Sequence, residues 1–285
     1  MRLNILAEWT NECNLSCRIC PISRPDGRPK GHMDLELWLK ILDCCKREGH
    51  FVGWSHFFGE PLLWKHFFIG MKMWRESGLS RYGSISTNGH LLTDDRIECI
   101  AESGIKCLRI CVDSLRPQVY ESLRGSSQHV ELITKTERFL RKAPNVPCQV
   151  QFLQSSINVD EGPHDFLKYF HGYKNLSVFA SYCQNIGGDA SLSVCRNPSP
   201  DPRKCTKVDY EHCVITWDGQ VGLCCIDYDL LNCLGGLSGD SINEVFLGEY
   251  AEGVRSQIKE GNYQFAPYCS MCPMDHVEYV GREVF

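Results

Sequence analysis

Three cysteines with the spacing CxxxCxxC follow the short apolar run LNILAEW near the beginning of the chain. They are Cys13, Cys17 and Cys20. Thiolates are soft ligands that select iron-sulfur clusters or zinc, and a closed zinc site normally needs a fourth protein ligand. No His follows at zinc-finger spacing. Three thiolates are the set that leaves the fourth iron of a 4Fe-4S cube open, and a structural zinc knuckle is the alternative.

A second group of cysteines lies in the last third of the chain. Gly, Ser and Pro are frequent in residues 187–204, which we interpret as a linker. Beyond it, the segment CVITWDGQVGLCC predicts a β-hairpin around an Asp-Gly turn. Consecutive strand residues point to opposite faces, so Cys225 is expected to pack away from any ligand at Cys224. The candidate ligands of a second site are Cys205, Cys224, Cys269 and Cys272, with Cys213 as an alternative to Cys205 and a zinc ribbon as the alternative to a cluster.

The elements that must position these cysteines alternate between short apolar runs and amphipathic stretches over residues 1–183. This alternation is typical of parallel βαβ units. The fold class that we expect is α/β, with a partial (β/α)6 TIM-like barrel over residues 1–190 and a small C-terminal domain, a β-hairpin plus helix, over residues 200–285. The predicted strands are 2–8, 51–57, 82–86, 106–112, 147–154 and 175–182, and helices are predicted between them.

Polar residues follow the predicted strands, where the active sites of such barrels lie. The cysteine motif follows the first strand, and Gly59-Glu60-Pro61 follows the second. The order of these motifs resembles the radical S-adenosylmethionine (SAM) family, whose GGE motif is matched here except that Phe58 replaces its first Gly. The resemblance implies cofactor-binding roles for Ile19, Gly59, Glu60, Pro61, Ser86, Thr87, Asn88, Asp113, Ser114, Gln154, Ser155 and Asn158.

The resemblance also implies a set of cofactors. In the family, SAM chelates the open iron, and one electron cleaves it to a 5'-deoxyadenosyl radical that abstracts hydrogen from the substrate. The protein then positions the reactants and excludes side reactions. The C-terminal domain resembles the truncated SPASM, or twitch, domain, which carries one auxiliary 4Fe-4S cluster. A full SPASM domain needs further cysteines after Cys272, and the sequence has none.

Twitch-type members of the family include 2-deoxy-scyllo-inosamine dehydrogenase, epimerases of aminoglycoside antibiotics and enzymes that modify peptides. Cys13 lies so near the start that we expect no leader-recognition domain, and therefore a small sugar or aminocyclitol as substrate. We expect an epimerase that inverts a carbinol carbon, with the Cys183 thiol returning the hydrogen; a dehydrogenase or a peptide-modifying enzyme is the alternative. The expected substrate-binding residues are Glu8, His56 and Asp189.

Composition limits the class of partner. The net charge of -5 comes without a long run of either sign, so we expect neither nucleic acid nor an anionic membrane, and a cationic substrate is favoured. No apolar run could span a bilayer, and we expect a cytoplasmic protein with a flavodoxin or ferredoxin as reductant. A zinc-stabilised binding protein on a degenerate barrel is the alternative from another class.

Six cysteines in apolar patterns are expected to pack in the core: Cys44, Cys45, Cys99, Cys107, Cys111 and Cys148.

Overall fold

The structure, a computed structural model, describes residues 1–183, 186–193, 203, 205, 212–239 and 241–272, together with the backbone of 282–284. Its first six strands are parallel and pair in sequence order. All six predicted strands are present, although the second ends at Trp54 and not at residue 57. They are β1 (Asn4–Ala7), β2 (Phe51–Trp54), β3 (Ser84–Thr87), β4 (Cys107–Cys111), β5 (Cys148–Gln154) and β6 (Leu176–Tyr182).

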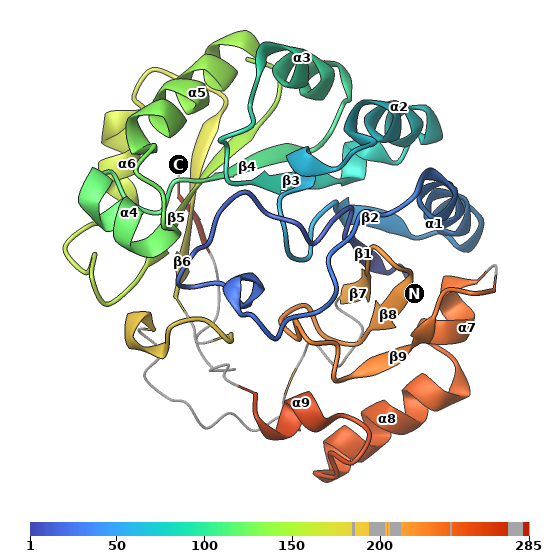
Figure 1. The fold of residues 1–285 in the computed structure, drawn as a ribbon. Coiled ribbons are helices and arrows are strands. Elements are labelled where there is room, and N and C mark those ends of the chain that lie inside the picture. The colour runs from blue at the N-terminus through green and yellow to red at the C-terminus, as the bar shows by residue number, and fades with distance from the viewer. Residues whose placement is uncertain are drawn as a thin grey trace.

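Helices cover the outer face of this curved sheet and form an arc around it (Figure 1). Helix α1 begins where the Asp34 side chain accepts a hydrogen bond from the Leu37 amide at 2.7 Å, and it ends at Gly49 in the left-handed region. The sheet and its helices confirm the predicted partial (β/α)6 barrel, to which α4 is an additional helix. The helices are α1 (Leu35–Glu48), α2 (Phe67–Ser77), α3 (Asp94–Glu102), α4 (Pro117–Arg124), α5 (His129–Lys142) and α6 (Pro163–Tyr169).

A cluster of four buried tryptophans packs between the first strand and helices α1 and α2. Trp9 stacks on Trp64 with ring centroids 4.7 Å apart. Trp38 and Trp74 meet Trp9 edge to face at 5.4 and 5.7 Å. Stacked and edge-to-face pairs of this kind add to the stabilisation that burial provides. This tryptophan cluster therefore fixes α1 and α2 against the strand that leads into the first three cysteines.

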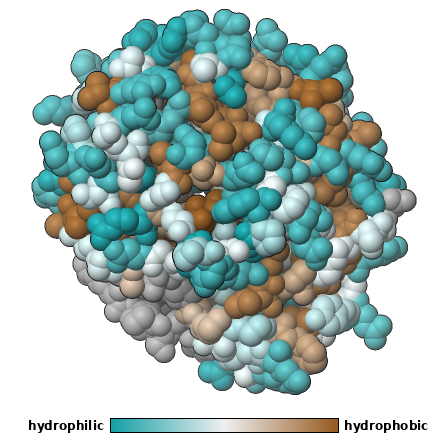
Figure 2. Space-filling model, in the orientation of Figure 1, coloured by the Kyte–Doolittle hydropathy of each residue, from teal (hydrophilic) through white to brown (hydrophobic). Residues whose placement is uncertain are grey.

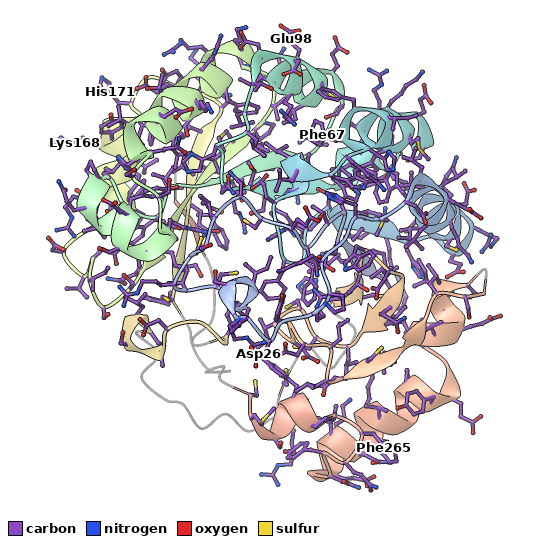
Figure 3. All side chains as sticks on the ribbon, in the orientation of Figure 1. Asp26, Phe67, Glu98, Lys168, His171 and Phe265 are labelled. Atoms are coloured by element: carbon purple, nitrogen blue, oxygen red, sulfur yellow. The ribbon has the colours of Figure 1, made fainter. Side chains whose placement is uncertain are left out.

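The outer surface of the helical arc carries polar and charged side chains together with a few exposed apolar ones, such as Phe68 and Val130. Side chains crowd the space inside the arc, whereas Glu98, Lys168 and His171 project outward from it (Figure 3). Within the described part of the chain, no helix has the length and apolar character needed to cross a membrane.

The chain after residue 211 adds strands to the same sheet, beside β1 (Figure 1). Strand β7 (His212–Ile215) pairs parallel to β1, and β8 (Gln220–Gly222) and β9 (Cys233–Gly236) continue the sheet in antiparallel pairs. At the opposite edge, β10 (Arg282–Val284) pairs with β6. We call residues 212–272 the C-terminal unit; its helices are α7 (Ile242–Phe246), α8 (Glu249–Glu260) and α9 (Pro267–Ser270).

The predicted hairpin of the C-terminal unit is present, but it differs in two respects. It is followed by a third strand, β9. Strand β8 ends at Gly222, so Cys224 and Cys225 lie beyond the strand, in a turn. The expectation that strand alternation separates these two cysteines is therefore wrong. Cys213 on β7 is fully buried in the core, which argues against it as the alternative to Cys205.

Candidate active site

The cysteine segment, residues 13–20, is held by backbone hydrogen bonds to three parts of the barrel. The Glu60 amide, after β2, donates to the Glu12 carbonyl at 2.8 Å. The Arg18 amide donates to the Leu123 carbonyl of α4 at 3.1 Å. The Asp189 amide, after β6, donates to the Arg18 carbonyl at 2.7 Å. The carboxyl-terminal side of the barrel therefore fixes the position of the three cysteines.

Gly59 allows the segment after β2 to touch the chain just before the cysteines. Its φ of +86° lies in the left-handed region, which glycine adopts without steric cost. A Cβ atom at this position would lie 2.3 Å from the carbonyl oxygen of Thr10 and 2.9 Å from that of Glu12. Both the backbone conformation and the close approach therefore require glycine here.

Hydrogen-bond donors lie beside two of the three sulfur atoms of the cysteine segment. The side-chain amide of Asn88 lies 3.8 Å from Cys13 Sγ, and the Arg124 guanidinium lies 3.7 Å from Cys17 Sγ. Burial raises the pKa of Cys13 to about 11 and that of Cys20 to about 12, so bound iron must displace these protons. Hydrogen bonds to sulfur are typical of iron-sulfur sites. This donor set fits three cluster thiolates; among the described residues, no three His, Cys, Asp or Glu side chains meet around a single metal ion.

Glu60 is buried and links the ends of β2 and β3. Its carboxylate accepts hydrogen bonds from the Leu62 amide at 3.0 Å, the Thr87 hydroxyl at 2.7 Å and the Asn88 amide at 2.7 Å. Burial raises the pKa of Glu60, whereas these hydrogen bonds oppose the rise. Pro61, also buried, follows it as the first residue of a short 3-10 helix. In this structure the side chain of Glu60 positions Asn88 beside Cys13, and its contact with the cofactor stays a prediction.

Asp113 and Arg124 form a buried ion pair beside Cys17. Asp113 has a φ of +62°, which is uncommon for a residue other than glycine. Its carboxylate also accepts a hydrogen bond from the Gln151 side chain at 3.1 Å, and its carbonyl accepts one from the Asn158 side chain at 3.0 Å. Although burial opposes it, the Asp113 charge raises the pKa of Arg124 well above its usual value. The pair places a permanent cation at the carboxyl end of β4.

The remaining predicted cofactor residues lie at the same side of the barrel and bind one another. The Ser114 hydroxyl donates to the Glu161 carboxylate at 2.6 Å. The amide and hydroxyl of Ser155 donate to the Asn158 side chain at 2.6 and 2.9 Å. Gln154 is the last residue of β5. These bonds organise the carboxyl ends of β4 and β5, and direct contact of these residues with SAM stays a prediction.

A cavity of about 400 Å³ lies between the cysteine segment and the interior of the barrel. Figure 2 shows a hollow near the middle of this face, with apolar surface recessed among hydrophilic residues. Of the predicted cofactor and substrate residues, Ile19, Ser86 and His56 line this active-site cavity beside Cys20. The rest of its described lining contains no Asp or Glu; the rings and basic groups include Trp54, Phe57, Phe58, Phe179, Arg109 and His212.

Cys183 follows β6 and lies in the wall of the active-site cavity. Its side chain is packed with Cys17, Ile19 and Leu123 and is only 3% exposed. Its amide donates to the Gln154 carbonyl at 2.7 Å, which extends the pairing of β5 and β6. Burial raises the pKa of Cys183 to about 12, so the sulfur keeps its proton at neutral pH. The structure thus brings a protonated thiol next to the first cysteine site.

Two other thiols line the same cavity, although both were predicted to pack elsewhere. Cys225 is hydrogen-bonded to the Cys224 thiol and, like Cys20, packs against the apolar cluster that includes Phe58. Cys111 lies two residues after Arg109 on β4, and both line the cavity because strand residues two apart share a face. That spacing could have revealed Cys111. The position of Cys225 depends on where β8 ends, for which the sequence pattern gives no signal.

Glu8 and Asp189, predicted to bind a cationic substrate, have other partners and do not line the cavity. Glu8 is completely buried, and its carboxylate accepts hydrogen bonds from Nη1 and Nη2 of Arg28 at 3.1 and 2.6 Å. Asp189 pairs with Arg18 at 2.5 Å. Hydrogen bonds from Ser191 and Arg18 lower the pKa of Asp189 to about 2. Both carboxylates therefore anchor arginines in or near the cysteine segment, and this geometry argues against direct contact with an ammonium group.

The predicted ligands of the second site lie in the C-terminal unit, apart from Cys205, which precedes it. Burial, and then the nearby Cys272 and Cys205, raise the pKa of Cys269 to about 12. The Asn232 side chain donates to Cys269 Sγ at 3.2 Å, a contact that suits a cluster thiolate. Cys224 lies in the turn after β8. The donor set of four thiols again fits an iron-sulfur cluster.

Comparisons with known proteins agree with this geometry. The Radical SAM superfamily model matches residues 8–145, and the SPASM iron-sulfur cluster-binding domain model matches residues 205–273. The tungsten-containing aldehyde ferredoxin oxidoreductase cofactor-modifying protein of Pyrococcus furiosus is 30% identical over 190 residues, which cover 65% of this chain and 49% of that protein. The S-adenosyl-L-methionine-dependent 2-deoxy-scyllo-inosamine dehydrogenase of Niallia circulans is 33% identical over 108 residues, covering 36% and 41%. The matched region spans less than half the length of each relative.

A solved structure shares the whole fold. The crystal structure of BtrN in complex with AdoMet and 2-DOIA aligns over 100% of this chain and 99% of that chain, with a TM-score of 0.64 and 20% sequence identity. The two domain matches and the thiol sites imply SAM and 4Fe-4S clusters, one of them auxiliary. The chain therefore carries a radical SAM domain over residues 8–145 and a C-terminal SPASM iron-sulfur cluster-binding domain over residues 205–273.

Proposed function

We propose that the protein is a radical SAM epimerase that inverts a carbinol carbon of an aminoglycoside-like or aminocyclitol-like substrate. The observation that carries the proposal is the protonated Cys183 thiol in the cavity that Ile19 and Cys20 also line. An S–H bond is weaker than the C–H bond that it makes, so a thiol can return hydrogen to a carbon radical. The Cys183 thiyl radical that is left would regain the thiol by taking up one proton and one electron, for which an auxiliary cluster would be the source. Return from the face opposite to abstraction inverts the carbon.

Different residues of the chain have different roles around this cavity. Bound SAM supplies the radical that removes hydrogen from the substrate. Gly59 and Glu60 hold the cysteine segment against the barrel, and Arg124, paired with Asp113, places a fixed cation at the cavity wall. A buried, preorganised wall of this kind keeps the substrate oriented and excludes water from the reactive carbon.

The lining of the active-site cavity suits a hydroxylated ring. Aromatic side chains such as Trp54 and Phe179 offer flat apolar faces, and Ser86, Gln151 and Ser181 offer neutral hydrogen-bonding groups. Small-molecule sites commonly combine apolar surface with a few polar groups that set orientation. Because the described lining contains no carboxylate, we place the hydroxyl groups of the substrate, and not an ammonium group, against this wall.

A dehydrogenase that oxidises a secondary alcohol to a ketone is the second candidate. The similarity to the 2-deoxy-scyllo-inosamine dehydrogenase of Niallia circulans favours it. So does Cys225, which contacts Cys224 and lines the cavity, so that the second cysteine site lies next to the substrate. A peptide-modifying enzyme is a third candidate from the same superfamily.

The proposal includes a reductant and a cellular setting. We propose a flavodoxin or ferredoxin as the electron donor, because SAM cleavage needs one electron. We also propose a cytoplasmic location: no disulfide joins the cysteines that the structure describes, and thiol sites for metal clusters suit a reducing compartment.

The proposed function is tested with anaerobically reconstituted enzyme, SAM, a reductant and candidate aminoglycosides in heavy water. A thiol exchanges its proton with solvent, so an epimerase should place one solvent deuterium at the inverted carbon. A product two hydrogens lighter than the substrate identifies a dehydrogenase instead. Protein that forms no 5'-deoxyadenosine with any substrate would overturn both candidates.

The role of Cys183 is tested by replacing each thiol of the cavity wall. Cys183→Ala should lower the rate of inversion by about 100-fold or more, as for other lost proton or hydrogen donors, while 5'-deoxyadenosine still forms. Cys225→Ala is the matched comparison, because its thiol lines the same cavity. Inversion that survives in Cys183→Ala but is lost in Cys225→Ala would transfer the role to Cys225.

A further inference from the structure

His56 lines the active-site cavity but has no hydrogen-bond partner among the described residues. It follows β2, and its Nδ1 atom is buried and unpaired. Buried polar groups in folded proteins almost always have a partner, and each exception calls for an explanation. An unpaired ring in the wall of a ligand cavity is explained if the ligand supplies the missing partner.

Three buried histidines of the protein each have a hydrogen-bond partner within the chain, although Nδ1 of His90 is unpaired, like that of His56. His50 Nε2 lies 2.9 Å from the Asn243 side chain, His90 Nε2 lies 2.7 Å from the Tyr120 hydroxyl, and His129 Nε2 lies 2.9 Å from the Ser114 carbonyl. Each of these three buried rings therefore has at least one partner in the chain. His56, whose ring alone of these four lines the active-site cavity, is without one in the described part of the chain.

The surroundings of His56 determine its charge. Burial, and then the positive charges of Arg109 and Arg124, lower its pKa to about 4. Arg109 is itself held in place, with its guanidinium carbon 3.6 Å from the Phe179 ring centre and 4.5 Å from that of Trp54. A neutral imidazole has one donor and one acceptor nitrogen. Because no group among the described residues selects the tautomer, the unpaired Nδ1 atom can donate a hydrogen bond to a bound ligand or accept one from it.

We propose that His56 positions the substrate by holding, as a neutral ring, the hydroxyl oxygen of the carbon that loses hydrogen. This inference rests on the proposed function and adds to it a substrate class, a hydroxylated ring recognised through its hydroxyl groups. It is consistent with a cavity lining that has aromatic faces and no carboxylate among the described residues. His56 acts here as a positioning residue and transfers no proton.

The test measures binding without turnover. Holoenzyme with SAM and no reductant is titrated by calorimetry with neutral scyllo-inositol and with cationic 2-deoxy-scyllo-inosamine. His56→Phe, which removes the hydrogen bond, should weaken both probes about tenfold, whereas His56→Gln should stay within about threefold. His171→Phe, on the exposed outer surface, is the control and should bind like the wild type.

The dependence of affinity on pH provides a second readout. The groups that face His56 are Arg109 and Arg124, with Asp113 as the partner of Arg124, and His212 also lines the cavity. Since the pKa of His56 is about 4, its affinity for scyllo-inositol should be constant from pH 5.5 to 8. A loss of affinity below pH 6.5 that persists in His212→Gln but disappears in His56→Gln would contradict a neutral ring.

Several outcomes would overturn the proposal. Unchanged affinity in His56→Phe would show that the ring only packs, and weakened binding of the amine alone would show that it recognises the ammonium group. Wild-type enzyme that binds neither probe would exclude this substrate class. The proposed activity is tested separately, by whether the enzyme forms 5'-deoxyadenosine. If His56→Phe fails to fold, the ¹⁵N shifts of the His56 ring decide: they should change when scyllo-inositol binds, and unchanged shifts would overturn the contact.

Discussion

At the scale of single residues, two carboxylates near the cysteine segment are each bound to an arginine. Glu8 and Asp189 lie close to the cysteine segment, as their positions after β1 and β6 predict. Each forms an ion pair with an arginine, Arg28 and Arg18 respectively. An arginine distant in sequence leaves no local pattern that could reveal the pairing of Asp189. The presence of a carboxylate near the site can thus be predicted from the sequence. Whether that carboxylate is free to bind a substrate depends on its partners in the folded structure.

The two carboxylates should respond differently to neutralisation. Glu8→Gln leaves the Arg28 guanidinium, which is only 10% exposed, without its counter-charge, and should lower the free energy of unfolding by about 3 kcal/mol or more. Asp189→Asn removes an exposed pair and should change stability little. Thermal unfolding of both holoenzyme variants measures this. Equal effects, or weaker binding of substrate by folded Glu8→Gln, would restore Glu8 as a substrate ligand.

At the scale of elements, periodicity predicted every strand of the barrel but not every boundary. Alternating apolar and amphipathic stretches are a strong signal because each parallel strand is buried on both faces. Helix α4, Pro117–Arg124, was missed because it shares one connection, between β4 and β5, with the longer helix α5, and only α5 was predicted there. The end of β8 was missed because the apolar letters continue into Cys224 and Cys225, whereas the chain turns after Gly222.

The loop after β2 should control assembly of the first cluster. Gly59→Ala brings a Cβ atom to 2.3 Å from the Thr10 carbonyl, so the chain before Cys13 must move. We expect purified protein to hold about half of its iron, because the first cluster is lost and the auxiliary one remains. Gly49→Ala is the matched control: its φ of +78° is also left-handed, but no atom lies within 4 Å of the added carbon. Iron analysis and visible absorbance measure the result, and full iron content in Gly59→Ala would contradict it.

At the scale of the whole molecule, the sequence predicted two domains but not that one sheet joins them. Strand β7 pairs with β1 along its full length, from Asn4 with His212 to Ala7 with Ile215. Parallel pairing across such a separation in sequence follows from no short-range motif. As a result, the strand that leads to Cys13 also supports the hairpin that leads to Cys224.

The shared sheet should make the barrel and the C-terminal unit unfold together. Anaerobic urea titration of the holoenzyme, followed by far-ultraviolet circular dichroism and by cluster absorbance, should give coincident transitions. Ile215→Pro, which lies opposite Ala7, should move both transitions to lower urea concentration without separating them. Loss of auxiliary absorbance well before loss of helical signal would show that the two parts are independent.

The tryptophan cluster has a consequence for binding experiments that are followed by fluorescence. Four of the six tryptophans pack against one another in the core beside β1, away from solvent. Trp54, by contrast, stands in the cavity wall with its ring over the Arg109 guanidinium. Of the six tryptophans, all in the described part of the chain, only Trp54 lines the cavity, so a ligand that enters should perturb the emission of this indole. Trp54→Phe should silence the signal, and the native chain thus carries its own fluorescent reporter of occupancy.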